Sequence, residues 1–115
     1  MLSLAASPRV HLATEPVNFH HGHAGLCGIV RNHLDGEPLT DVWVFFNRTR
    51  TDLKILWFDH GGFVVAHKKL AQGRFRVPPA TGRQVSMTSA ELAALLEGID
   101  LTQARRLPRW SPATT

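Results

Sequence analysis

Three histidines stand within four positions in the stretch NFHHGHA, residues 18–24, and histidine is a common zinc ligand. A zinc site needs three or four ligands at about 2.0–2.3 Å, and His20 and His23 are spaced so that one helix face could offer both. No other Cys or His pair in the sequence has the spacing of paired ligands, so further ligands cannot be identified. We therefore predict no metal site and no other cofactor.

Two other interpretations of these histidines stay open. If a helix begins near them, its free N–H groups and its dipole favour an anion, so His20 and His21 could contact a phosphate or a partner protein. Alternatively, the two residues form an exposed first turn without a binding role.

The sequence offers little support for catalysis. Asp59 and His60 are adjacent, but an Asp followed by glycines between two apolar runs is typical of a hairpin turn. No Ser or Cys has an evident base, and no carboxylate cluster suggests a two-metal nuclease. The lone cysteine, Cys27, excludes an intramolecular disulfide and is expected to pack as a small apolar residue. We predict that the protein is not an enzyme.

Basic residues are the more informative set. The chain has 13 Lys and Arg against nine Asp and Glu, a formal net charge of +4. Basic side chains that alternate along strands could form one solvent-facing basic sheet face, which would follow a phosphate backbone without reading sequence. An ordinary solubilising surface is the alternative. The candidate nucleic-acid or partner contacts are Arg48, Arg50, Lys54, Lys68, Lys69, Arg74, Arg76, His20 and His21.

The elements that must position these side chains are predominantly strands. Runs rich in β-branched and aromatic residues are typical of strands, and the short polar connections between the middle runs imply an antiparallel meander. Alternating RFRV suits an edge strand, ended by Pro78 and Pro79. The aromatic residues Trp43, Trp57, Phe58 and Phe63 are expected mostly in the core. Strands are predicted at 9–14, 42–46, 53–58, 63–67 and 74–77.

Two helices are predicted beside these strands. Apolar residues at helical spacing indicate a first helix over 19–34, with Asn18 as its N-cap and Gly36 as its stop. Thr88 and Glu91 form a capping box ahead of a second apolar helical stripe, which a glycine at 98 helps to close.

Together these elements predict an α+β fold, with a mostly antiparallel four- to five-stranded meander sheet and two helices packed on one face. We expect a single domain over residues 1–101 and a basic, proline-containing, flexible tail over 102–115. The sequence has no apolar run of transmembrane length and no convincing signal peptide. A cytoplasmic protein is therefore expected.

Two long stretches carry a family resemblance: FFNRTRTDLKILWFDHGGFVVAHKKLAQGRF at 45–75 and VSMTSAELAALLEGID at 85–100. They resemble the small TnpB-type accessory protein of bacterial insertion sequences of family 66, which is unrelated to the RNA-guided nuclease of the same name. The resemblance covers roughly residues 9–101 and includes the opening VHLAT and the stretch ending GHAGL.

The resemblance implies a non-catalytic accessory protein of DNA transposition that binds transposon DNA, the separate transposase of the same element, or both. No membrane or small-molecule substrate is implied. Similar proteins usually carry adjacent Arg and Lys where this chain has His20 and His21. Histidine is mostly neutral at pH 7, so the interpretation that this chain is a functionally weakened copy also stays open. A pure protein-interaction module without DNA affinity is the alternative function, and a metalloenzyme built on the histidine cluster is the less favoured third one.

Overall fold

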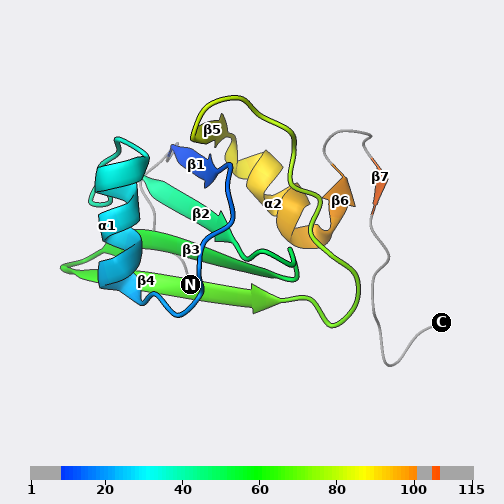
Figure 1. The fold of residues 1–115 in the computed structure, drawn as a ribbon, viewed down its shortest axis with the longest axis horizontal. Helices are drawn as coiled ribbons and strands as arrows, with labels where there is room; N and C mark the ends of the chain where they lie inside the picture. Colours follow the sequence, from blue (N-terminus) through cyan, green and yellow to red (C-terminus); the bar gives the residue numbers. More distant parts are fainter. Residues whose placement is uncertain (1–8, 101–104, 107–115) are drawn as a thin grey trace.

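The computed structural model describes residues 9–100 and 105–106 (Figure 1). Within these residues a five-stranded sheet, a two-stranded sheet and two helices form. In chain order the elements are β1 (Val10–Ala13), α1 (His23–His33), β2 (Val42–Phe46), β3 (Asp52–Asp59), β4 (Gly62–Lys69), β5 (Gln84–Met87), α2 (Ser89–Glu97), β6 (Ile99–Asp100) and β7 (Arg105–Arg106).

The larger sheet has the strand order β4-β3-β2-β1-β5. Strands β2, β3 and β4 form the predicted antiparallel meander, and β5 is antiparallel to β1. Only β1 and β2 are parallel, and α1 makes the crossover between them. The predicted α+β class with a mostly antiparallel sheet is confirmed.

The fifth strand is not the one predicted. Residues 74–77 form no strand; their one main-chain hydrogen bond to the meander runs from Phe75 N to Arg50 O (2.7 Å). Pro78 and Pro79 follow, and proline has no N–H to extend a ladder. The place beside β1 is taken instead by β5, with Leu12 opposite Val85.

The prediction that both helices pack on one face is wrong. All five residues of β2 are buried, and alternate side chains enter different clusters. Val44 packs in the cluster that contains Leu95 of α2, whereas Trp43 packs in the cluster that contains Leu26 of α1. The helices therefore cover opposite faces (Figure 1). An uninterrupted apolar strand such as VWVFF is typical of a strand covered on both sides.

The start of α1 also differs from the prediction. The helix begins at His23 with Gly22 as its N-cap, and no side chain caps it. Asn18 instead accepts a hydrogen bond from His20 N (2.8 Å), a local turn that its side chain favours. Gly36 lies just beyond the C-cap, Leu34, and a Cβ there would collide with the indole of Trp43. Close approach to Trp43 explains this glycine.

The predicted capping box of α2 is confirmed. The hydroxyl of Thr88 accepts from Glu91 N (3.0 Å), and the Glu91 carboxylate accepts from Thr88 N (2.9 Å). Gly98 ends the helix with φ +83°, a conformation that glycine adopts without a steric penalty.

Most of the predicted tail lies outside the described residues, so the domain boundary at residue 101 stays a prediction. Within the tail, Arg105–Arg106 pair with β6. In the described part of the chain no helix is long and apolar enough to cross a membrane.

Candidate nucleic-acid interface

The segment that follows β4 lies alongside the turn between β2 and β3. Leu70 N donates to Thr51 O (2.8 Å), and Phe75 N donates to Arg50 O (2.7 Å). Phe75 is 1% exposed and anchors the segment in the core, while its neighbours Arg74 and Arg76 are exposed. Two parts of the sequence that are 19 to 25 residues apart at these bonds thus meet at one end of the sheet.

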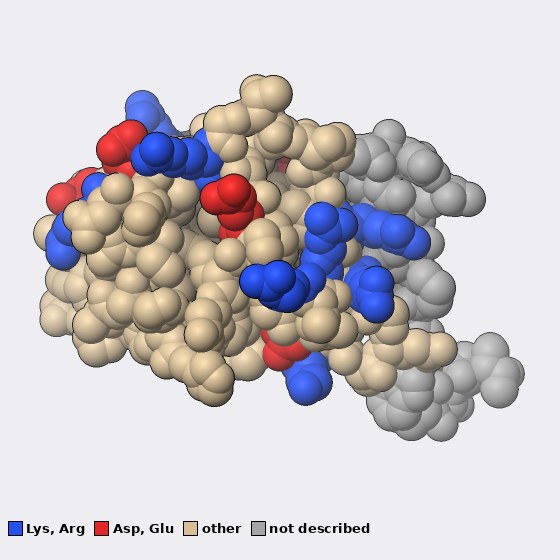
Figure 2. All heavy atoms as spheres, viewed as in Figure 1, with Lys and Arg blue, Asp and Glu red and all other residues tan. Residues whose placement is uncertain are grey.

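Six of the predicted contacts gather at this end, which we call the basic end. Figure 2 shows Lys and Arg side chains grouped over the β2–β3 turn and the segment after β4. All six residues are exposed. Among the described residues, Arg48, Arg74 and Arg76 make no ion pair or hydrogen bond through their side chains, so their guanidinium groups are available. The basic end consists of Arg48, Arg50, Lys68, Lys69, Arg74 and Arg76.

The structure does not have the predicted single basic face of the sheet. Lys54 and Lys68 lie on opposite faces of the sheet, because Lys54 pairs with His67 and Lys68 with Leu53. Each face carries a helix, so neither is open to a flat ligand. Lys68 reaches over the α2 face and donates to Leu96 O (2.6 Å). The cations come together around the end of the sheet.

The histidine segment lies to one side of the basic end. His20 and His21 are exposed in the turn before α1. Pro16, Val17 and Asn18 separate two grooves, a larger one of about 470 Å³ against α1 and a smaller one of about 420 Å³. The smaller groove runs between residues 16–19 and residues 47–49, so it includes Arg48.

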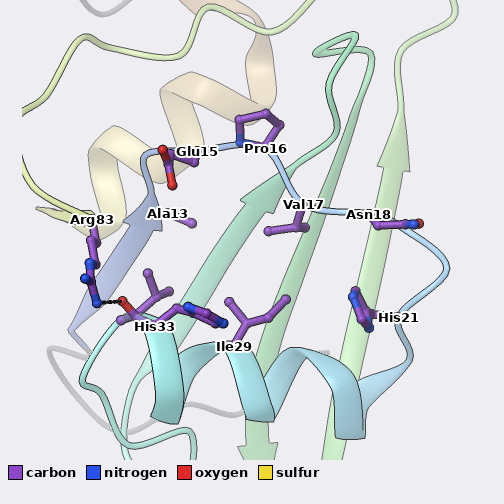
Figure 3. Close-up of a pocket in the computed structure, with 10 residues that line it drawn as sticks. Ala13, Glu15, Pro16, Val17, Asn18, His21, Ile29, His33 and Arg83 are labelled. Carbon is purple, nitrogen blue, oxygen red and sulfur yellow. Dashed lines mark hydrogen bonds between the residues drawn. The ribbon is translucent and has the colours of Figure 1, made fainter.

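Figure 3 shows the larger groove, with His21 and His33 on the α1 side and Glu15 on the opposite side. Arg83 lies at one end and donates from Nη1 to His33 O (3.3 Å). Sequence reasoning missed this groove because its lining comes from segments up to seventy residues apart. Within the described residues no group of three His, Cys, Asp or Glu side chains could hold a metal ion.

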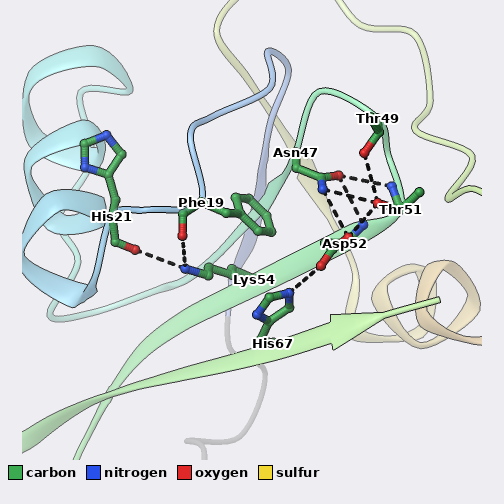
Figure 4. A network of polar contacts seen from close by, with 8 residues as sticks. All are labelled: Phe19, His21, Asn47, Thr49, Thr51, Asp52, Lys54 and His67. Carbon is green, nitrogen blue, oxygen red and sulfur yellow. Dashed lines mark hydrogen bonds and ion pairs between the residues drawn. The ribbon is translucent and has the colours of Figure 1, made fainter. Parts of the chain in front are cut away.

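A hydrogen-bond network fixes the β2–β3 turn (Figure 4). The Asn47 side chain accepts from the main-chain N–H groups of Thr51 and Asp52 (3.0 and 3.1 Å). The Asp52 carboxylate, 7% exposed, accepts from the Thr51 hydroxyl (2.6 Å) and from Asn47 (3.1 Å). His67 Nε2 lies 2.7 Å from its other oxygen. This network holds Arg48 and Arg50 in a defined turn.

The charge state of Asp52 follows from this network. Burial favours the neutral acid, but the hydrogen bonds from Thr51, His67 and Asn47 and the charge of Lys69 outweigh it, so the pKa of Asp52 lies below its ordinary value. Although Asp52 and His67 resemble a catalytic pair, the nearby Thr51 hydroxyl donates to the carboxylate, not to the imidazole. We interpret the network as structural.

Lys54, a predicted contact, has a structural position instead. Its Nζ donates to Phe19 O (2.8 Å) and His21 O (3.1 Å), as Figure 4 shows, and lies 5.0 Å from the Phe19 ring centroid. The ammonium therefore ties the turn before α1 to the middle of β3.

Two smaller predictions hold. Asp59 and Gly62 pair across a two-residue turn formed by His60 and Gly61, both with positive φ, which is the predicted hairpin. Cys27 is 5% exposed, and burial raises the pKa of its thiol, as expected for a packed small residue.

The comparisons with known proteins agree with the earlier resemblance. The family model described as "IS66 Orf2 like protein" matches residues 8–106, nearly the whole described chain. The chain belongs to the IS66 Orf2-like family. Family membership suggests an accessory role in insertion-sequence transposition.

Two curated relatives come from Sinorhizobium fredii. One, "Uncharacterized protein y4jC", is 30% identical over 109 residues, covering 94% of this chain and 93% of the relative. The other, "Uncharacterized protein y4hO", is 35% identical over 101 residues, covering 87% and 88%. No solved structure matches the chain. The relatives thus match over nearly their full length, and their names assign no activity.

Proposed function

We propose that this IS66 Orf2-like protein is a non-catalytic accessory factor of transposition that binds element DNA in the bacterial cytoplasm through its basic end. The observation that carries the proposal is the concentration of six exposed cations around one end of the sheet. Arginine dominates there, and its planar fork suits bidentate contact with phosphate.

The basic end suits contact with the DNA backbone more than reading of base edges. Its cations come from a turn, a strand end and an irregular segment, so none of them lies on a helix that could enter a major groove. Such contacts fix position and supply salt-dependent affinity, whereas sequence choice comes from elsewhere. We assign sequence choice to the transposase of the same element.

A second candidate function is docking of that transposase without DNA affinity. It is favoured by the larger groove, whose mixed lining includes the apolar residues Val17, Ile29 and Leu34. Such a groove could accept an apolar side chain of a protein partner.

The two candidates separate in one experiment. Labelled duplexes carrying the element's terminal repeat, or a scrambled repeat, are titrated with purified protein across a salt series. We expect similar binding to both duplexes, with an affinity that falls steeply with salt. The Arg48→Ala/Arg50→Ala variant should bind at least tenfold more weakly and lower the slope of log affinity against log salt by about 2.

The matched control is Arg31→Ala/Arg83→Ala, which removes the same charge where each arginine already has a partner. Arg31 lies 3.5 Å from Glu37, and Arg83 donates to His33 O. Equal losses of DNA affinity in both variants would indicate an effect of net charge alone. Absence of DNA binding at low salt would favour the second candidate, docking of the transposase.

A further inference from the structure

The outer edge of β4 carries main-chain groups without partners. Leu70 N donates to Thr51 O, which makes residues 51 and 70 a hydrogen-bonded pair of the β3–β4 ladder. Such pairs alternate along an antiparallel ladder, so the main-chain groups of alternate β4 residues point away from β3. Within the described residues no hydrogen bond uses these outward groups. The outward residues are Phe63, Val65, His67 and Lys69.

The lysines Lys68 and Lys69 protect only one end of this edge. The other devices of natural edges are prolines, bulges, inward charges or very short strands, and residues 62–66 have none of them. Residues 62–66 of β4 read GFVVA and pair with β3 without interruption, whereas the opposite edge, β5, has only four residues. Eight residues of regular strand are therefore open to pairing.

Both apolar layers of the protein end half-covered at this strand. Val64 and Ala66 pack against the cluster beneath α2, and Phe63 and Val65 against the cluster beneath α1. All four side chains are only half-buried. A further strand added here would extend both layers at once, and strand addition is a common mode of protein recognition.

We propose that β4 pairs antiparallel with β4 of a second copy of this chain, about a two-fold axis at Val65, and joins the two sheets into one. Charge distribution along the edge favours this occupant and direction. Lys68 and Lys69 lie at one end of β4, and Asp59 lies beside the other. Antiparallel pairing brings the lysines of each copy to the other copy's Asp59, whereas parallel pairing would place like charges together.

Pairing of the two strands in the register centred on Val65 gives partners to the outward main-chain N–H and C=O groups of β4. Val65 faces its own counterpart, and Phe63 faces His67 of the other copy, which gives about six main-chain hydrogen bonds. Lys68 and Lys69 then face Gly62 and Gly61, where an added Cβ would meet nothing within 4 Å. The glycine turn leaves room for the two lysine side chains.

Sedimentation velocity of the full chain over a wide concentration range tests the dimer. We expect a species of about twice the 12.8 kDa chain mass for the wild type. Val65→Pro removes one outward N–H and should leave a folded monomer, because prolines are tolerated at that position of an edge strand. Ser86→Pro, at an outward position of β5, should keep the dimer. Circular dichroism reports whether each variant folds.

A cross-linking experiment keeps the proposal testable if Val65→Pro unfolds. Val65→Cys should form an intermolecular disulfide on oxidation, because a hydrogen-bonded pair has its Cα atoms about 5.5 Å apart. His60→Cys, in the exposed turn, should not. A wild-type monomer at all concentrations, a dimer that survives folded Val65→Pro, or a dimer that does not cross-link at residue 65 would overturn the proposal. These results do not depend on DNA binding.

Discussion

The two turns at opposite ends of β3 differ in length, charge and internal bonding. The β2–β3 turn has five residues, two of them arginines, and Asn47 and Asp52 bond across it. The β3–β4 turn has two residues, and among the described residues the side chain of its flanking Asp59 contacts His60, at 3.5 Å. A two-residue turn suffices to reverse the chain. The longer turn needs its buried network because it holds arginines in place beside a second basic segment.

The largest stability effect is expected from Asp52→Ala. Truncation leaves the partly buried donors of Thr51 and Asn47 without their acceptor, which should cost about 1–3 kcal/mol of unfolding free energy. The matched change at the other turn, Asp59→Ala, should cost less than about 0.5 kcal/mol. Urea unfolding of both variants measures the difference. Equal losses of unfolding free energy would mean that Asp52 stabilises its turn no more than Asp59 stabilises the other turn.

The lowered pKa of Asp52 adds a pH dependence. A carboxylate whose folded-state pKa lies below its unfolded value, about 3.9, contributes full stability above that pH. The contribution is lost as the pH falls through the folded-state pKa. Wild-type protein should therefore lose more stability on acidification below about pH 4 than Asp52→Asn does. Parallel curves for the two proteins would show that Asp52 contributes nothing to acid unfolding.

A smaller effect is expected from Lys54→Met, which keeps the apolar stem and removes the ammonium. Loss of its bonds to Phe19 O and His21 O should cost about 1 kcal/mol and speed amide hydrogen exchange in residues 19–23. DNA affinity should change less than about twofold, because this charge is already engaged by the chain. A loss of DNA affinity as large as that of the Arg48/Arg50 variant would show that Lys54 contributes to DNA binding.

The smallest effect is expected from a pair of asparagine substitutions. Arg50 and His60 both have left-handed backbone conformations, with φ +58° and +47°. Asparagine tolerates this region better than either, so Arg50→Asn and His60→Asn should each stabilise the fold by up to about 0.5 kcal/mol. Only Arg50→Asn should weaken DNA binding. Similar binding by both variants would remove the functional distinction between the turns.

Short-range sequence patterns correctly predicted the elements that depend only on neighbouring residues. The capping box at Thr88 and Glu91 and the Asp-His-Gly-Gly turn act within a few residues, so both were predicted correctly. The start of α1 was not, because Asn18 serves a turn as readily as a helix cap. The position of the basic residues depends on main-chain bonds from residue 70 to 51 and from 75 to 50, which no local pattern reveals.

Position in the sheet also separates residues that look alike in sequence. Lys54, Lys68 and Lys69 all lie on strands, but Lys54 donates to carbonyl groups in the turn before α1, whereas the other two lie at the end of β4 beside the β2–β3 turn. Strand pairing decides the face and the end of the sheet at which each side chain lies, and pairing is a long-range property.

The most direct test of the basic end is an NMR titration of ¹⁵N-labelled protein with a short duplex at low salt. We predict amide shifts concentrated in residues 47–51 and 68–76, with residues 86–90, at the far edge of the sheet, unchanged. Shifts centred on residues 86–90, or no shifts at any residue, would contradict DNA binding through the basic end.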